Sequence, residues 1–267
     1  MTPRQHCIAC LEQTPARPFE AALWVDVEHD GAVNVPAVLA SMDDLKREVA
    51  RQLPNLPARE LAQPLLRQMV VMGFAQADPC HPRPHAALLS QVLARRRGQP
   101  LGLALVALEL AQRLEIPLEG VNFPGHFLLR VPGSDHVLDP CGGRRLYPKD
   151  CRELLARQFG PQMQLQAEHL MPASPREMLQ RLSRNLRHLH KLNDLYMPAL
   201  IDATRVLELG DASTADYLAR AALYQAMECP HAERFDLERA MLLSDDPVQR
   251  LRLEQRLRAL PLGHALH

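Results

Sequence analysis

The segment from Gly102 to Leu114 constrains the fold more than any other part of this sequence. It reads Gly-Leu-Ala-Leu-Val-Ala-Leu-Glu-Leu-Ala-Gln-Arg-Leu, so a helix formed here has almost no polar face. Such a helix is stable only when neighbouring elements bury it on most sides. Pro100 suits its first turn, where the missing N–H costs nothing and φ is already set. The chain is therefore predicted to fold around a central helix.

The segments on either side of this helix predict two different kinds of structure. Between residues 41 and 99, apolar residues recur at helical spacing in short pieces that prolines separate, which indicates a helical lead-in. After the central helix, Gly120–Phe123, His126–Val131 and His136–Asp139 have the composition of strands and are punctuated by Pro-Gly pairs. We expect an α+β fold in which the central helix packs on a small antiparallel sheet, followed by an all-α tail.

The tail contains an internal repeat with a period of 35 residues. With this shift, Leu200 falls on Phe235, Val206 on Met241, Leu207 on Leu242, Asp211 on Asp246 and Leu218 on Leu253. Tetratricopeptide units repeat at about 34 residues as paired antiparallel helices that hide their apolar faces by stacking. The repeat predicts two such units, with Asp211 and Asp246 in turns. A generic helical bundle is the alternative.

Charge and hydropathy exclude several classes of partner. Lysine plus arginine and aspartate plus glutamate both total 31, so no overall field attracts nucleic acid or anionic lipid. The apolar run Leu103–Leu108 is far shorter than the roughly 20 residues that span a bilayer. Residues 1–23 do not resemble a signal peptide, because prolines and charges interrupt them. We expect a cytoplasmic protein with no membrane or nucleic-acid partner.

The cysteines are predicted to be free thiols, since six of them are spread along a chain long enough to fold without disulfides. Cys7 and Cys10 form a C-x-x-C, but the second pair that a structural zinc site needs is missing at a suitable spacing. We predict no metal and no cofactor. The run Arg95–Arg97 is interpreted as solvated surface, with an anion site as the alternative.

Three segments in the middle of the chain together resemble a known family. Val92–Leu101, Phe123–Arg130 and Leu138–Pro140, in this order and spacing, are similar to the SirB family of bacterial proteins. That family joins a transglutaminase-like domain to tetratricopeptide repeats. The resemblance implies a poorly defined segment at 1–40, a transglutaminase-like domain at 41–165 and helical repeats at 175–262.

The same resemblance identifies candidate site residues. Active transglutaminase-like enzymes place a cysteine at the start of a buried helix, where the helix N-terminus and an imidazolium lower the thiol pKa, and a carboxylate orients the imidazole. His126 matches the histidine and Asp139 the aspartate. The nucleophile position is Pro100, which has no nucleophilic atom. Near position 102 many family members carry serine or threonine, whereas this chain has Gly102.

The strand register decides how His126 and Asp139 meet. A two-residue turn at Pro132-Gly133 places them directly opposite each other, with Cβ atoms about 5 Å apart. A longer turn through Asp135 places His126 opposite Cys141 and leaves Asp139 as a diagonal neighbour. Both registers allow the pair to touch, either as a structural hydrogen bond or as the lining of a binding groove.

Two functions are consistent with this pattern. The first is a non-catalytic module that binds a protein or peptide through the groove and the repeat face, because the scaffold is intact while the thiol is absent. The second is a cysteine-dependent hydrolase or acyltransferase that uses a relocated thiol, for which Cys141 is the candidate. Cys141 lacks the helix N-terminus that activates a thiol, which favours the binding module.

Overall fold

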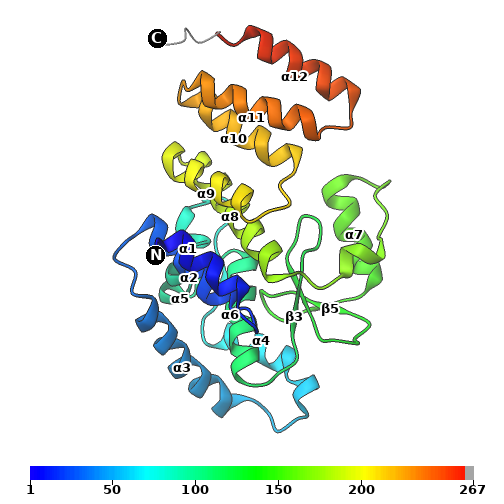
Figure 1. Ribbon diagram of the computed structural model, residues 1–267. Coiled ribbons are helices and arrows are strands. Elements are labelled where there is room, and N and C mark those ends of the chain that lie inside the picture. Colours follow the sequence, from blue (N-terminus) through cyan, green and yellow to red (C-terminus); the bar gives the residue numbers. More distant parts are fainter. Residues whose placement is uncertain (262–267) are drawn as a thin grey trace. The chain divides into compact units, whose positions relative to one another are not determined.

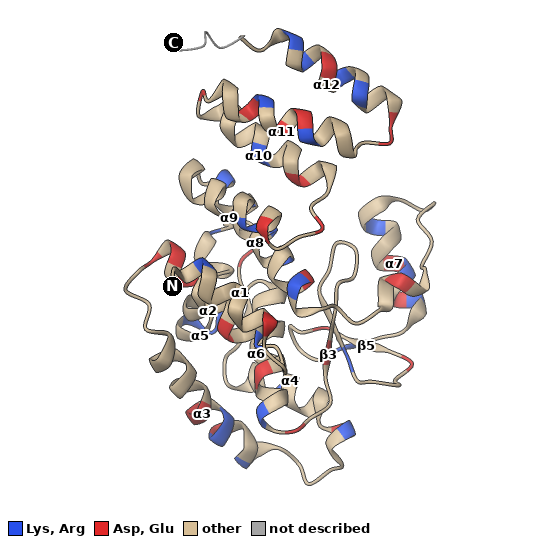
Figure 2. Ribbon diagram, in the orientation of Figure 1, with Lys and Arg blue, Asp and Glu red and all other residues tan. Residues whose placement is uncertain are grey.

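The computed structural model describes residues 1–261 (Figure 1). Contacts divide the chain into two units, Met1–Leu182 and Ser183–His267. The helix α8 (Pro175–Leu192) runs through the boundary between them. None of the helices in the described part has the length and apolar character needed to cross a membrane. Basic and acidic residues are interspersed along the helices of both units (Figure 2).

The first unit combines helices with a small antiparallel sheet, as the sequence predicts for an α+β fold. Its other helices are α1 (Pro3–Glu12), α2 (Pro18–His29), α3 (Val35–Gln52), α4 (Ala62–Val71), α5 (Leu89–Arg95), α6 (Pro100–Arg113) and α7 (Pro148–Phe159). Its sheet has the order β3 (Glu119–Val121), β4 (Leu128–Arg130), β5 (Val137–Leu138) and β6 (Arg145–Leu146). A separate parallel pair joins β1 (Ala75–Gln76) to β2 (Arg97–Gly98).

The apolar segment forms the central helix α6, as predicted. Pro100 occupies its first turn, and residues along its whole length, such as Leu103, Val106 and Leu110, are buried. The helix contacts β3 and β4. Leu128 belongs to a cluster that includes Leu155 of α7. Because successive strand residues point to opposite faces, the sheet presents one face to α7 and the other to α6.

Residues 1–40, expected to be poorly defined, contribute to the core. The helices α1 and α2 pack against each other, and Phe19 and Leu23 of α2 are buried. The helix α3 begins at Val35, with the Asn34 side chain accepting a hydrogen bond from the Ala37 N–H (3.1 Å). The sequence did not reveal this burial, because it depends on contacts of α2 with α5 and α6, which are distant in the chain. In addition, α2 has few polar residues that would indicate which of its sides faces solvent.

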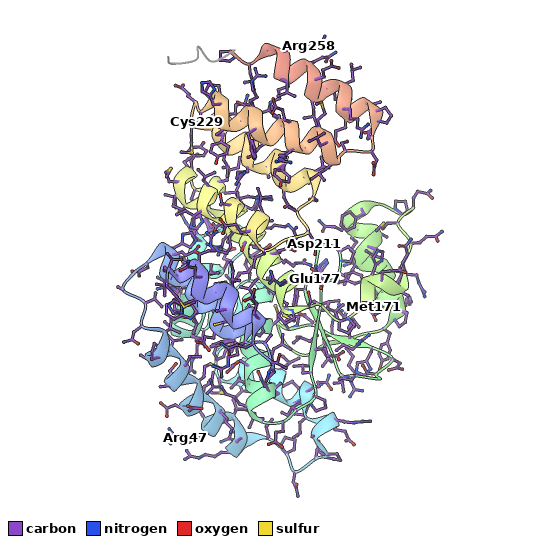
Figure 3. All side chains as sticks on the ribbon, in the orientation of Figure 1. Arg47, Met171, Glu177, Asp211, Cys229 and Arg258 are labelled. Atoms are coloured by element: carbon purple, nitrogen blue, oxygen red, sulfur yellow. The ribbon has the colours of Figure 1, made fainter. Side chains whose placement is uncertain are left out.

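The second unit is entirely helical. After the end of α8 it contains α9 (Tyr196–Glu208), α10 (Thr214–Ala226), α11 (Pro230–Leu243) and α12 (Pro247–Ala259). A shift of 35 residues superimposes α9 on α11 and α10 on α12, with the first residues of each pair agreeing to within two positions. Asp211 lies in the connection between α9 and α10 (Figure 3). The tail is therefore all-α, with two successive helix pairs. Leu262, the last residue of the predicted repeat segment, lies outside the described residues.

Candidate functional site

His126 lies in the connection between β3 and β4 rather than inside a strand. Its backbone N–H donates to the Phe123 carbonyl (3.0 Å), which closes a turn through Pro124 and Gly125. Gly125 has φ of +73°, the conformation that a type II turn needs after proline. The strand β4 therefore begins at Leu128, two residues later than the predicted start, because the Pro-Gly turn occupies the preceding residues.

Arg181 of α8 holds this connection in place. Its guanidinium donates to the Phe123 carbonyl (2.9 Å) and to the Asn122 side chain, and it lies 5.9 Å from the centre of the Phe127 ring. No local sequence motif marks Arg181, because its partners are 54 or more residues away in the chain.

The His126 imidazole is half-buried, with its ring centre 6.4 Å from that of Phe123. Its Nδ1 is inaccessible to solvent and has no hydrogen-bond partner among the described residues. Buried polar atoms are nearly always paired, with protein or with ordered water. Among the described residues, this nitrogen does not bond to the Asp139 carboxylate, the partner that the resemblance implies.

Asp139 follows β5 and stabilises its own turn. Its carboxylate accepts a hydrogen bond from the Cys141 N–H (2.9 Å), and its carbonyl accepts one from Gly143 (2.8 Å). The side chain of Gln63 on α4 donates to the Gly143 carbonyl (2.7 Å). A Cβ at Gly143 would lie 3.0 Å from the Cβ of Leu66, so only glycine allows this loop to approach α4 so closely.

The register of the hairpin is that of the longer turn. Leu129 pairs with Leu138, and extending this register places His126 opposite Cys141. In the described part of the chain, no hydrogen bond joins the His126 ring to the Asp139 carboxylate, which is occupied by the Cys141 backbone. The contact expected between His126 and Asp139 remains a prediction.

The start of α6 presents no nucleophile. Pro100 is the first residue of the helix, and the preceding Gln99 donates its N–H to the Ala86 carbonyl (2.7 Å). A Cβ at Gly102 would lie 3.3 Å from a methyl carbon of Val92 on α5. Glycine at this position lets α6 approach α5 closely, and a serine or threonine here would push Val92 away.

Cys141 is poorly suited to act as the relocated nucleophile. Burial raises the pKa of its thiol to about 12, and the Asp139 carboxylate adds to this through its negative charge and a hydrogen bond with the thiol. A nucleophilic cysteine needs the opposite environment, one that lowers the thiol pKa. The Cys141 side chain is therefore a neutral thiol at physiological pH.

We expect Cys141 to react with iodoacetamide at pH 8 at least about 100-fold more slowly than the exposed Cys80, because only the thiolate attacks. Asp139→Asn removes the negative charge that disfavours the thiolate, so it should accelerate labelling of Cys141 and leave Cys80 unchanged. Mass spectrometry of tryptic peptides measures both rates in one sample. Equal rates for the two cysteines in the unmodified chain would contradict the prediction.

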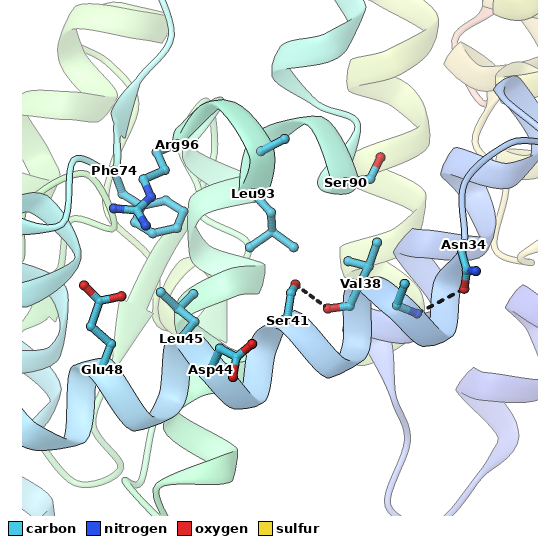
Figure 4. A pocket seen from close by; sticks show the side chains of 12 residues that line it. Asn34, Val38, Ser41, Asp44, Leu45, Glu48, Phe74, Ser90, Leu93 and Arg96 are labelled. Atoms are coloured by element: carbon cyan, nitrogen blue, oxygen red, sulfur yellow. Dashed lines mark hydrogen bonds between the residues drawn. The ribbon is translucent and has the colours of Figure 1, made fainter.

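A groove of about 490 Å³ lies between α3 and α5 (Figure 4). Apolar side chains line its floor, among them Val38, Leu45 and Leu93. The carboxylate of Glu48 and the guanidinium of Arg96 lie toward one end. A volume of this size falls within the range of small-molecule and peptide pockets.

Two arginines of the run Arg95–Arg97 bond to the protein itself, although the run was interpreted as solvated surface. Arg96 lies over the Phe74 ring (5.8 Å to its centre) and donates to the Met72 carbonyl, while Arg97 donates to the Gly73 carbonyl. Both carbonyls follow the C-terminal end of α4, where carbonyl groups lack partners within the helix. These two arginines therefore have a structural role.

Comparisons with known proteins agree with the resemblance. A family model described as the transglutaminase-like superfamily matches residues 36–184. A UPF0162 protein of Pseudomonas aeruginosa is 56% identical over the whole of both chains. Protein SirB1 of Salmonella typhimurium is 26% identical over 62% of each chain. The human F-box only protein 21 is 40% identical over 80 residues, which cover 26% of this chain and 13% of that protein.

Proposed function

This chain belongs to the SirB family of transglutaminase-like proteins, and from that premise we propose that it is a non-catalytic module that binds a peptide or protein partner. The observation that carries the proposal is the proline at position 100, where the family motif of active enzymes requires a thiol. Proline supplies neither a nucleophile nor a donor N–H. An acyl-enzyme cannot form at this position.

The alternative function, a hydrolase or acyltransferase that uses Cys141, is less well supported. A thiol with a pKa of about 12 is almost entirely protonated at pH 7, so little thiolate is available for attack. The neighbouring Asp139 carboxylate opposes formation of the thiolate instead of assisting it. The chemistry of Cys141 therefore favours the binding module.

The groove between α3 and α5 is the proposed binding site in the first unit. Its apolar floor offers area for hydrophobic burial, and the carboxylate of Glu48 and the guanidinium of Arg96 offer polar contacts that fix the orientation of a ligand. Because these charges have opposite sign and lie toward one end, a short peptide with an apolar side chain and a charged neighbour fits the lining. Ser41 and Ser90 also line the groove, so their hydroxyl oxygens can accept hydrogen bonds from the backbone of such a peptide.

A peptide-display selection against the full chain tests the proposal. We expect the selection to enrich short apolar sequences. Their affinity for Leu93→Glu, measured by fluorescence anisotropy, should be at least about tenfold lower than for the unmodified chain, because this change puts a charge on the apolar floor of the groove. Val71→Glu, at a position that is 78% exposed and outside the groove, is the matched control. Selected peptides that bind Leu93→Glu as tightly as the unmodified chain would rule out this groove. Cleavage or acyl transfer of a bound peptide that Cys141→Ser abolishes would establish the alternative.

A further inference from the structure

The last two helices of the second unit leave a cluster of apolar side chains exposed. Leu242 and Leu243 at the end of α11 are 68% and 50% exposed, and Val248 and Leu251 on α12 are each 56% exposed. A hollow of about 520 Å³ lies beside Leu242 and Leu251. Four large apolar residues this close together are unusual on a surface without a partner. We call these four residues the terminal apolar surface.

The internal repeat indicates what kind of element covers this surface. Leu207, one period before the exposed Leu242, is half-buried. Val206, one period before the partly buried Met241, is fully buried. In stacked helical repeats, a neighbouring helix covers each apolar face. No helix follows α12 in the described part of the chain. The terminal apolar surface therefore lacks the helix that its repeat position calls for.

We propose that a second copy of this chain supplies that helix, so that two copies pair through α12 around a two-fold axis. In an antiparallel arrangement, Val248 of each copy packs against Leu251 of the other. A two-fold interface is closed, because the same surface serves both copies and nothing remains for a third. The contact involves only the second unit, and it does not depend on peptide binding in the groove between α3 and α5.

The charges along α12 favour a second copy in this antiparallel orientation. Asp245 lies just before the N-cap residue Asp246, and Val248 and Arg252 are four residues apart on one face of α12, so an acidic residue precedes the apolar one and a basic residue follows it. Read in the opposite direction, this stripe is basic, apolar and acidic, so an antiparallel copy sets each Asp245 near the Arg252 of its partner. Both side chains are exposed, and neither forms an ion pair within the described chain. A parallel pairing would oppose like charges, which is unfavourable.

Sedimentation velocity of the full chain tests the proposal. At about 50 µM and low salt we expect a species of twice the 30.0 kDa chain mass, which dissociates on dilution. Leu251→Asp should produce a monomer, because it places two carboxylates at the centre of the interface. Val71→Asp, at an exposed apolar position of the first unit, is the matched control and should remain dimeric. Circular dichroism checks that both variants are folded.

A charge exchange separates this arrangement from other dimers. Arg252→Asp should weaken the dimer at least about tenfold at low salt, because it opposes Asp245 of the other copy. Adding Asp245→Arg to the same chain should restore the dimer, since two-fold symmetry makes both new pairs attractive. A chain that stays monomeric at this concentration, a dimer that survives Leu251→Asp, or a double variant that stays weak would each overturn the proposal. Loss of the dimer with intact peptide binding would leave the proposed function standing.

Discussion

Asp202→Ala is expected to lower the free energy of unfolding of the helical tail by about 3–5 kcal/mol. Asp202 and Arg205 are completely buried on α9 and form an ion pair of 2.8 Å. The other carboxylate oxygen lies 2.7 Å from Nδ1 of His190. Alanine removes the carboxylate and leaves a buried guanidinium without that partner. Leaving a buried charge uncompensated is among the most costly single changes in a folded protein.

The measurement must distinguish the two units of the chain. Hydrogen exchange of amides in α9 and α10 reports on the tail, whereas fluorescence of Trp24, the single tryptophan, reports on the first unit. Glu238→Ala removes an exposed carboxylate from α11 and should change the exchange rates little. The double variant Asp202→Leu with Arg205→Met replaces both charges by apolar groups and should recover most of the loss. A loss below about 1 kcal/mol for Asp202→Ala would contradict the prediction.

The central helix could be predicted from sequence because its signal is local. The apolar period of residues 102–114 identified α6, which runs from Pro100 to Arg113, and the fold class followed from the strands after it. The strands themselves are shorter than predicted. The Pro124-Gly125 turn takes His126 and the Pro132-Gly133 turn takes Val131, both of which strand composition had assigned to β4.

The candidate site was less predictable, because its geometry depends on distant contacts. The sequence allowed two hairpin registers, and the local composition of the strands does not choose between them. Arg181 and Gln63, which hold the two loops, lie 54 or more residues from the groups that they contact. The sequence could place a proline at the expected nucleophile position but could not show that Cys141 shares a hydrogen bond with Asp139.

Asp26 belongs to the same class of residues that only the structure reveals. It lies on α2 between valines and is 1% exposed, and nothing in its local sequence explains a buried carboxylate. Its two oxygens accept hydrogen bonds from the backbone N–H groups of Leu89 (3.1 Å) and Ser90 (2.6 Å). These groups open α5, whose first N–H groups have no partners within the helix. Asp26 therefore caps a helix 63 residues away and ties it to α2.

Asp26→Ala is expected to destabilise the first unit by about 2–4 kcal/mol at pH 5, because it leaves two buried backbone donors unpaired. Burial raises the pKa of Asp26 to about 6 from 3.8, although the hydrogen bonds from Ser90 and Leu89 oppose this shift. Between these two pKa values, the folded chain holds a proton on Asp26 that the unfolded chain has released, so protonation favours the folded state. The resulting stabilisation is fully present below pH 4 and is lost as the pH rises through 6. The whole loss amounts to about 3 kcal/mol.

The cost of Asp26→Ala should therefore be larger at pH 5 than at pH 8, since at pH 8 the unmodified chain carries a buried charge that alanine relieves. Urea unfolding followed by Trp24 fluorescence, two residues away on the same helix, measures the difference at both pH values. Asp44→Ala, which removes an exposed carboxylate from α3, should show no comparable pH dependence. A cost that grows between pH 5 and pH 8 would mean that the ionised carboxylate is the stabilising form, and that its hydrogen bonds to Leu89 and Ser90 outweigh its burial.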